Sequence, residues 1–202
     1  METADKKLKQ IRDEVVGCQK CPLYRTRTLP VVGQGSHQAA VVFVGEAPGQ
    51  NEDKTGRPFC GQAGKVLDEL LSSVGWPREN VYICNILKCR PPQNRNPLEN
   101  EITACTSYLE KQLEAIQPKI IATMGNYATA FILKKYGLAD KIGGISKIRG
   151  QVFEAKTLFG QVKIIPLYHP AVAVYNANMK ETLKNDFKVL KKYGQTSKKK
   201  AD

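Results

Sequence analysis

Short, largely apolar runs alternate with segments of helical periodicity along this chain. The apolar runs lie at residues 39–44, 81–86, 119–124 and 162–167, and each has the length of a β-strand. Helical periodicity covers residues 5–16, 62–74, 96–116, 126–136 and 179–193, and a further strand at 151–155 pairs with the last apolar run across Phe159-Gly160. This order predicts a parallel sheet covered by helices on both faces. In such sheets, functional groups gather on loops beyond the carboxyl ends of the strands.

The length of 202 residues is typical of one domain. We assign residues 1–194 to this domain and residues 195–202 to a basic, disordered tail. No run is long and apolar enough for a membrane span, and the first ten residues lack the apolar core of a secretion signal, so we expect a cytoplasmic, nucleoid-associated protein. Thirty-one Lys and Arg against nineteen Asp and Glu give a formal charge of +12, which favours a polyanionic partner such as nucleic acid.

Four of the six cysteines can form a metal site. Cys18 and Cys21 make a CxxC, and Cys89 and Cys105 lie on later segments, so four thiolates can meet as one set of ligands. A zinc ribbon usually pairs two CxxC knuckles. One CxxC with two widely spaced cysteines therefore favours an iron–sulfur cluster, while zinc and ordinary buried thiols remain alternatives. Disulfides are disfavoured because the cytoplasm keeps thiols reduced.

Three polar loops follow predicted strands and can meet in one cleft at the edge of the sheet. They are Gly45-Glu46-Ala47-Pro48-Gly49, residues 85–92 and His169-Pro170-Ala171. The first loop lacks the Gly-Lys-Ser/Thr of a P-loop and the spacing of a dinucleotide-binding turn, so by itself it assigns no ligand. The histidine of the third loop is one of only two in the chain, and the proline after it makes its turn rigid.

A fixed order of motifs links these loops. GEAPG at residues 45–49 is followed by GRPF at 56–59, GQAG at 61–64, NILKCRPP at 85–92 and HPA at 169–171. This combination resembles the family 4 uracil-DNA glycosylases, the thermophile-type, iron–sulfur-containing branch of the uracil-DNA glycosylase superfamily. The resemblance runs from Cys18 to Tyr193 and includes all four cysteines. High lysine content and only three methionines are compatible with a thermophile.

The resemblance implies an α/β fold, a three-layer α/β/α sandwich with a central four-stranded parallel sheet. It implies a monofunctional DNA repair glycosylase that flips uracil out of DNA and hydrolyses its N-glycosidic bond, leaving an abasic site for base excision repair. It further implies a structural [4Fe-4S] cluster on Cys18, Cys21, Cys89 and Cys105. The implied uracil-binding residues are Gly45, Glu46, Ala47, Phe59, Asn85 and His169.

Elementary chemistry agrees with these roles. The amide of Asn85 can donate to uracil O4 and accept from N3–H, whereas cytosine has the opposite polarity at both positions. A mispaired buried contact of this kind costs about 1–3 kcal/mol. Phe59 can stack on the flipped base. His169 can donate an N–H to O2, where negative charge gathers as the glycosidic bond breaks.

The group that activates the attacking water is harder to assign. Related enzymes carry an aspartate two residues after the first glycine of the GEAPG motif, where this chain has Ala47. Glu46 and Glu52 are therefore the candidate catalytic carboxylates beside His169, since either could orient water or stabilise the sugar cation. The resemblance also suggests that Glu52 guards the pocket against the 5-methyl group of thymine.

Basic residues near the cleft are expected to bind the phosphates of single- or double-stranded DNA. These DNA-binding candidates are Arg57, Lys88, Arg90 and Lys180. A residue between Ala171 and Met179 is expected to wedge into the gap that the flipped base leaves. We expect the protein to act as a monomer.

Other interpretations stay open at this point. The chain could be a hydrolase of the same superfamily that acts on hypoxanthine or another damaged base, or a nucleic-acid-binding iron–sulfur or zinc module without chemistry. A sliding clamp is a further candidate partner, because four residues loosely fit a clamp-binding pattern. The same stretch also reads as a core strand, which is the favoured interpretation. The four residues are Gln161, Ile164, Leu167 and Tyr168.

Overall fold

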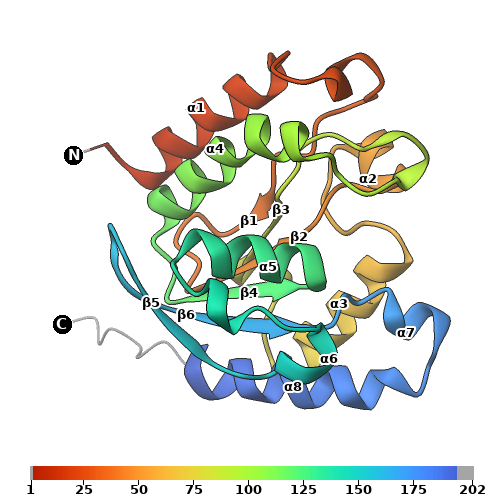
Figure 1. The fold of residues 1–202 in the computed structure, drawn as a ribbon, viewed down its shortest axis with the longest axis vertical. Helices are drawn as coiled ribbons and strands as arrows, with labels where there is room; N and C mark the ends of the chain where they lie inside the picture. The colour runs from red at the N-terminus through yellow and green to blue at the C-terminus, as the bar shows by residue number, and fades with distance from the viewer. Residues whose placement is uncertain (1, 195–202) are drawn as a thin grey trace.

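The computed structural model describes residues 2–194, and within this range six strands form one sheet (Figure 1). The order across the sheet is β1-β3-β2-β4-β6-β5. The strands are β1 (Gln34–Gly35), β2 (Val41–Gly45), β3 (Tyr82–Asn85), β4 (Ile120–Met124), β5 (Phe153–Thr157) and β6 (Gly160–Leu167). The predicted basic tail at 195–202 lies outside the described residues.

The four central strands run parallel, which confirms the parallel sheet expected from the sequence. β2 lies between β3 and β4, and β6 extends the sheet beyond β4. The sheet is wider than the expected four strands because an antiparallel strand closes each edge, β1 against β3 and β5 against β6. β5 was expected as the hairpin partner of β6. β1 was missed because two residues are too few to show an alternating pattern.

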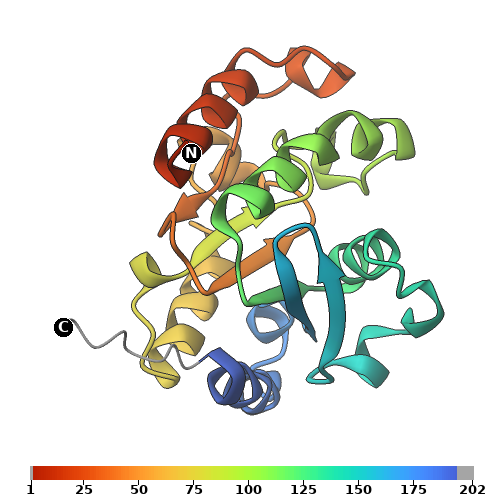
Figure 2. The ribbon, with the colours of Figure 1, turned by 90° about the vertical axis from the view of Figure 1, so that its left-hand side faces the viewer.

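Helices cover both faces of the sheet, as Figure 2 shows. Successive side chains of β2 point to opposite faces, so Val42 and Val44 pack with α1, α4 and α5, whereas Phe43 packs with α3 and α8. The result is the expected α/β/α sandwich with a core on each side of the sheet. The helices are α1 (Ala4–Val16), α2 (Gln50–Thr55), α3 (Gln62–Ser73), α4 (Glu99–Ile116), α5 (Asn126–Lys135), α6 (Ile145–Ile148), α7 (Val172–Tyr175) and α8 (Met179–Gly194).

Helix α4 begins later than expected, and the short helices α2, α6 and α7 were not expected. α4 was expected from Asn96-Pro97 but starts at Glu99, because the Glu101 carboxylate accepts the Leu98 N–H at 2.9 Å and caps the helix there. α2 was not expected at all, since six residues are too few for a helical period. It follows the GEAPG loop directly and places Glu52 beside the loops of the site.

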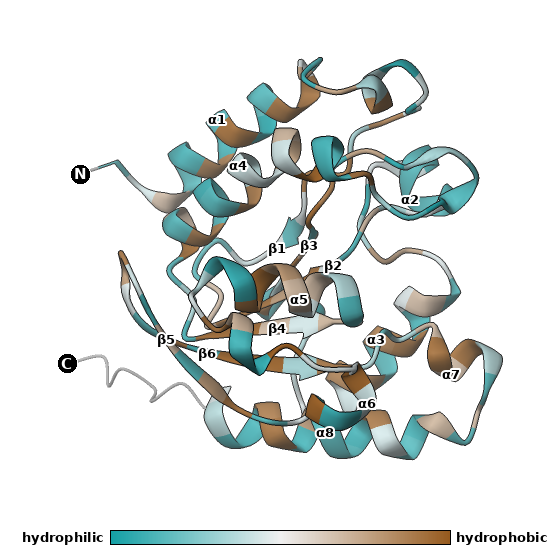
Figure 3. Ribbon diagram, viewed as in Figure 1, coloured by the Kyte–Doolittle hydropathy of each residue, from teal (hydrophilic) through white to brown (hydrophobic). Residues whose placement is uncertain are grey.

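Helix α7 differs from the longer helices because it exposes apolar side chains. The apolar residues of α3 and α8 pack into the core on one face of the sheet. In Figure 3 α8 alternates between brown and teal, whereas α7 is largely brown and lies at the edge of the fold. Val174 and Tyr175 on α7 are both exposed. Among residues 2–194, no helix combines the length and the apolar character that a bilayer span needs.

Candidate active site and cysteine pocket

The carboxyl ends of the parallel strands bring the predicted site residues together. Gly45, the last residue of β2, lies beside Asn85, the last residue of β3, in the register of the sheet. His169 follows the end of β6 and contacts the turn after β4, where a Cβ added to Gly125 would lie 3.5 Å from the His169 Cβ. The three loops expected to meet do meet, and the loop after β4 joins them.

Phe59 completes this group of residues. Its ring centroid lies 5.5 Å from that of His169, with the two planes tilted by 32°. A Cβ added to Gly45 would lie 2.9 Å from Phe59 Cζ and 2.3 Å from Asn85 Oδ1, so the phenyl ring and the amide both press against the glycine backbone. The absence of a side chain at Gly45 is what allows this approach.

The backbone of Phe59 is held in an unusual conformation. Its φ of 48° lies in the left-handed region, which bulky residues seldom adopt. The Arg78 guanidinium donates to the carbonyl oxygens of Pro58 at 2.6 Å and Phe59 at 3.2 Å, while it also pairs with Asp68 at 2.6 Å. Gly64 on α3 lets the turn approach, since a Cβ there would lie 1.9 Å from the Phe59 carbonyl oxygen. The turn that aims the phenyl ring is therefore fixed from two sides.

Asn85 carries a polar atom that the fold leaves open. The residue is 2% exposed, and its Oδ1 accepts no hydrogen bond within the described part of the chain. Leaving a buried acceptor unpaired costs free energy, and such atoms in native proteins often await a ligand or water. Both Oδ1 and the Phe59 ring lie against the Gly45 backbone.

His169 is oriented by the turn that follows it. The Ala171 N–H donates to its Nδ1 at 3.2 Å. Burial lowers the pKa of His169 to about 4, although the Glu52 carboxylate opposes this shift. The imidazole is therefore neutral near pH 7, and because Nδ1 is an acceptor its proton is on Nε2.

The two candidate carboxylates have different surroundings. Glu46 is half-buried, and burial raises its pKa above the ordinary value, so its carboxylate is more basic than a surface one. Glu52 accepts three backbone N–H groups, from Gly49 at 3.1 Å, Cys60 at 3.0 Å and Gly61 at 3.2 Å. These bonds tie the GEAPG loop to the loop of Phe59. Ala47 is partly buried and brings no polar side chain.

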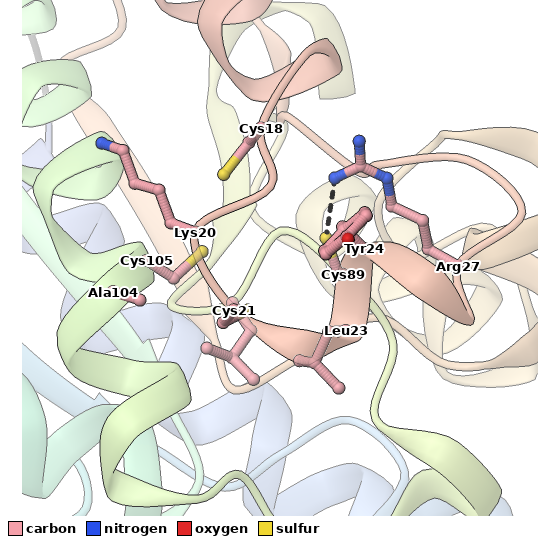
Figure 4. A pocket seen from close by; sticks show the side chains of 10 residues that line it. Cys18, Lys20, Cys21, Leu23, Tyr24, Arg27, Cys89, Ala104 and Cys105 are labelled. Carbon is pink, nitrogen blue, oxygen red and sulfur yellow. Dashed lines mark hydrogen bonds between the residues drawn. The ribbon is translucent and has the colours of Figure 1, made fainter.

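The four cysteines of the expected metal site line one pocket (Figure 4). The loop after α1 supplies Cys18 and Cys21, the loop after β3 supplies Cys89, and α4 supplies Cys105. The Arg27 guanidinium donates to Cys89 Sγ at 3.2 Å, the dashed bond in Figure 4, and to the Val16 carbonyl at 2.7 Å. Burial raises the pKa of Cys105 to about 11. The pocket therefore joins three segments that are far apart in sequence.

Comparison with known proteins agrees with this arrangement. A profile of the uracil DNA glycosylase superfamily matches residues 32–191, which include every strand and all the residues of the pocket around Asn85. The chain belongs to the uracil-DNA glycosylase superfamily. It is 45% identical to the Type-4 uracil-DNA glycosylase of Sulfurisphaera tokodaii, over 95% of this chain and 86% of the relative. This coverage necessarily includes Cys18 and Cys21, which lie outside the matched profile.

Two further relatives confirm the resemblance to the family 4 branch of the uracil-DNA glycosylase superfamily. The Type-4 uracil-DNA glycosylase of Archaeoglobus fulgidus is 46% identical over 90% of each chain. That of Thermotoga maritima is 43% identical over 87% of this chain and 88% of the relative.

Four residues were expected to contact DNA, and for one of them, Lys88, the structure contradicts this expectation. Lys88 is 1% exposed, and its Nζ donates to the Asn85 carbonyl oxygen and to Gln112, so it cannot reach a phosphate. Arg57 is exposed and Arg90 is partly exposed, with its Nε donating to Asn94 at 2.7 Å. Lys180 is paired with Glu69 at 2.6 Å.

The stretch that loosely fits a clamp-binding pattern forms β6 of the uracil-DNA glycosylase fold. Ile164 and Leu167 are completely buried in the core, so they cannot also occupy a groove on a clamp. The favoured interpretation of this stretch as a core strand is confirmed, and the clamp-binding motif is wrong for these residues.

Sequence reasoning missed the residues that support the pocket. Arg78 and Gly64 act on the Phe59 backbone, and Arg27 bonds a cysteine sulfur, but none of the three was given a role from the sequence. The GQAG motif offered a signal for Gly64, since a glycine near the start of a helix marks a close backbone approach. Arg27 and Arg78 could be found only from their contacts.

Proposed function

We propose that this chain removes uracil from DNA by hydrolysing the N-glycosidic bond, leaving an abasic site as the first step of base excision repair. The observation that carries the proposal is the buried, unpaired Oδ1 of Asn85, which lies against Gly45 beside the Phe59 ring. Uracil N3–H supplies the donor that this oxygen lacks, and the amide N–H of the same side chain can donate to uracil O4. Cytosine offers an acceptor at N3, so it leaves Oδ1 unpaired.

The same residues can also stabilise the charge that develops in the transition state. As the bond between C1′ and N1 breaks, its electron pair leaves with uracil and negative charge spreads to O2. We assign the Nε2–H of His169 as the donor to O2, because Nδ1 is engaged by Ala171. A fixed neutral donor stabilises the developing anion without needing to reorganise. Phe59 stacks on the base, and the backbone of Gly45, Glu46 and Ala47 forms its edge.

Glu46 is our choice for the group that orients the water. Its raised pKa makes it a better proton acceptor than an ordinary carboxylate, and it can take the proton as water adds to C1′. Glu52 shares its carboxylate among three backbone N–H groups, so we assign it a positioning role in which it holds the GEAPG and Phe59 loops together. Its contribution to catalysis acts through these loops.

We propose that Cys18, Cys21, Cys89 and Cys105 hold a [4Fe-4S] cluster. Four thiolates are the ligand set that such a cluster takes. Two N–H donors on sulfur, from Arg27 and the Lys88 backbone, also suit an anionic cluster. The cluster would supply a structural link between segments.

DNA is proposed to bind across the carboxyl edge of the sheet, in single- or double-stranded form. Arg57, Arg90 and Lys180 would bind phosphates, with Lys180 exchanging Glu69 for DNA. We place the wedge on α7, where Val174 is 44% and Tyr175 is 89% exposed, because exposed apolar side chains can fill the gap left by a flipped base. We propose a monomer that works in the cytoplasm on nucleoid DNA.

The test is to incubate the purified protein with an oligonucleotide that carries one uracil and then to cleave abasic sites with alkali. Wild-type protein should give alkali-dependent cleavage at uracil, and Asn85→Ala and His169→Ala should lose most of it. Oligonucleotides with hypoxanthine or a thymine mismatch test the other substrates. Cleavage at hypoxanthine alone would support the alternative base specificity, and no cleavage at any base would leave a DNA-binding metal protein.

A further inference from the structure

Lys88 lies between the pocket of Asn85 and the pocket of the four cysteines. Its Nζ donates to the backbone carbonyl oxygen of Asn85 at 2.8 Å and to Oε1 of Gln112 at 2.7 Å. Its backbone N–H donates to Cys105 Sγ at 3.2 Å. One buried residue therefore contacts both the strand end that carries the base-reading amide and a sulfur of the cysteine pocket.

Gln112 gives this arrangement a fixed anchor. Its Nε2 donates to the Val32 carbonyl at 2.9 Å and to the Tyr82 hydroxyl at 3.0 Å, so its Oε1 must be the atom that faces Lys88. Gln112 lies on α4, the helix that also supplies Cys105. Lys88 thus reaches α4 twice, once through its side chain and once through its backbone.

The amide of Asn85 depends on where the end of β3 lies. Its Oδ1 is confined beside Gly45 and Phe59, in a space that a small shift of the strand would close or widen. Hydrogen bonds weaken steeply as distances and angles depart from their optimum, so recognition by one amide needs an accurately placed backbone. Because the Lys88 Nζ bonds the carbonyl oxygen of Asn85 itself, it acts on the very residue that must be placed.

We propose that Lys88 is a positioning residue that fixes the uracil-reading amide of Asn85 relative to α4 and the cysteine pocket. The inference rests on the proposed function, since it concerns the site at which uracil would bind. It assigns to a buried lysine a role in the specificity of the pocket, in place of the phosphate contact that its sequence position suggested.

The test compares wild type with Lys88→Met, which keeps the length of the side chain and removes the donor. Free uracil is used as an inhibitor, because it probes the base pocket without DNA contacts. We expect its inhibition constant and KM to rise about tenfold while kcat changes by less than about threefold, since the lost contact serves bound base and transition state alike. Iron content and visible absorbance should match those of wild type.

Two further variants separate positioning from stability. Thr129→Val removes a buried hydroxyl that bonds Thr123 at 2.8 Å and has no contact with Asn85, so it should lower the melting temperature and leave uracil inhibition unchanged. Gln112→Leu removes the anchor of Lys88 but leaves the bond from Lys88 to Asn85. It should weaken uracil inhibition in the same direction and by a smaller factor.

Three results would overturn the inference or the proposed function. If Lys88→Met is destabilised like Thr129→Val but binds uracil as wild type does, the lysine is only structural and the inference is overturned. If Lys88→Met does not fold, unchanged uracil inhibition in Gln112→Leu overturns it instead. Absence of uracil cleavage and of uracil inhibition in wild type would overturn the proposed function, a failure that is visible before any variant is made.

Discussion

The Ala171 N–H donates to Nδ1 of His169, so the next turn of the chain fixes the tautomer of the imidazole. Because burial also lowers the pKa of His169 to about 4, the side chain presents a neutral Nε2–H to the pocket across the physiological pH range. This neutral N–H is available to stabilise the charge that is proposed to develop on uracil O2, and its protonation state stays the same across that range.

The pH dependence of activity should therefore follow Glu46 and not His169. As the proposed acceptor of the water's proton, Glu46 must be ionised to act, and burial raises its pKa, so kcat/KM should fall as the pH drops through that raised value. We expect Glu46→Gln to lower the plateau and to remove this acid limb. The measurement is kcat/KM on a uracil oligonucleotide from about pH 4 to 8. A limb near the ordinary histidine pKa that persists in Glu46→Gln would contradict the assignment.

The stability of the fold should also depend on His169. Below the ordinary pKa of 6.5 the unfolded chain binds a proton at this residue that the folded chain refuses until about pH 4. The free energy of unfolding should therefore fall as the pH is lowered through this window, and rise as the pH is raised through it. His169→Ala should show a flatter dependence in urea unfolding at a series of pH values. Parallel curves for the two proteins would contradict the lowered pKa.

Truncating the buried amides of Asn85 and Gln112 should affect different properties, activity for Asn85 and thermal stability for Gln112. Asn85→Ala should reduce kcat/KM by about 100-fold or more, because it removes both of the proposed contacts with uracil, yet it should change the melting temperature little, since Oδ1 has no partner to lose. Gln112→Ala removes an amide whose oxygen and nitrogen are both bonded, so it should lower the melting temperature markedly. Thermal unfolding of the two variants side by side makes the comparison, and equal destabilisation would contradict it.

Gly64 should tolerate no side chain. A Cβ there would lie 1.9 Å from the Phe59 carbonyl oxygen, a backbone atom that cannot rotate away. Gly64→Ala should displace the Phe59 turn and reduce kcat/KM by about tenfold or more, with a lower melting temperature. Gly17→Ala is the matched control, because its added Cβ meets only Asp13 O at an ordinary 3.8 Å. Equal activity in the two variants would show that Phe59 does not depend on this approach.

The sequence predicted the parallel core of the sheet. It also predicted that Gly45, Asn85 and His169 lie close together. Apolar runs with polar residues at their carboxyl ends are local signals, and the rules of parallel sheets bring those ends together. The four cysteines were likewise visible by type and spacing. The edge strand β1 and helix α2 were not, because both are too short to show a period.

Lys88 shows why the contacts made by tertiary packing could not be predicted from the sequence. A lysine between Asn85 and Arg90 in a polar loop looks like a phosphate ligand, and its burial depends on Gln112, which lies on another element. Glu52 presents the same problem, since its carboxylate is engaged by backbone N–H groups of a different loop. Local sequence indicates which groups can do chemistry. Whether a group faces solvent, substrate or its own backbone is decided by tertiary packing.

Tyr175 should matter for double-stranded DNA and little for single strands. It is 89% exposed and lies on α7, the short helix after His169, which Figures 1 and 3 show at the edge of the fold. Filling the gap left by a flipped base offsets the unstacking of a few kcal/mol, a cost that is smaller in a single strand. Tyr175→Ala should therefore lower kcat/KM on duplex uracil about tenfold more than on single-stranded uracil.

A matched control for Tyr175 is Leu158, which is 94% exposed at the tip of the β5–β6 hairpin, at the opposite end of β6 from His169. Leu158→Ala removes as exposed an apolar side chain and should leave both substrates unaffected. If Tyr175→Ala lowers activity equally on single and double strands, the tyrosine contacts the uracil strand and is not the wedge. In that case Val174→Ala, tested in the same way, shows whether α7 supplies the wedge at all, because a selective loss on duplex DNA requires a side chain that enters the stack.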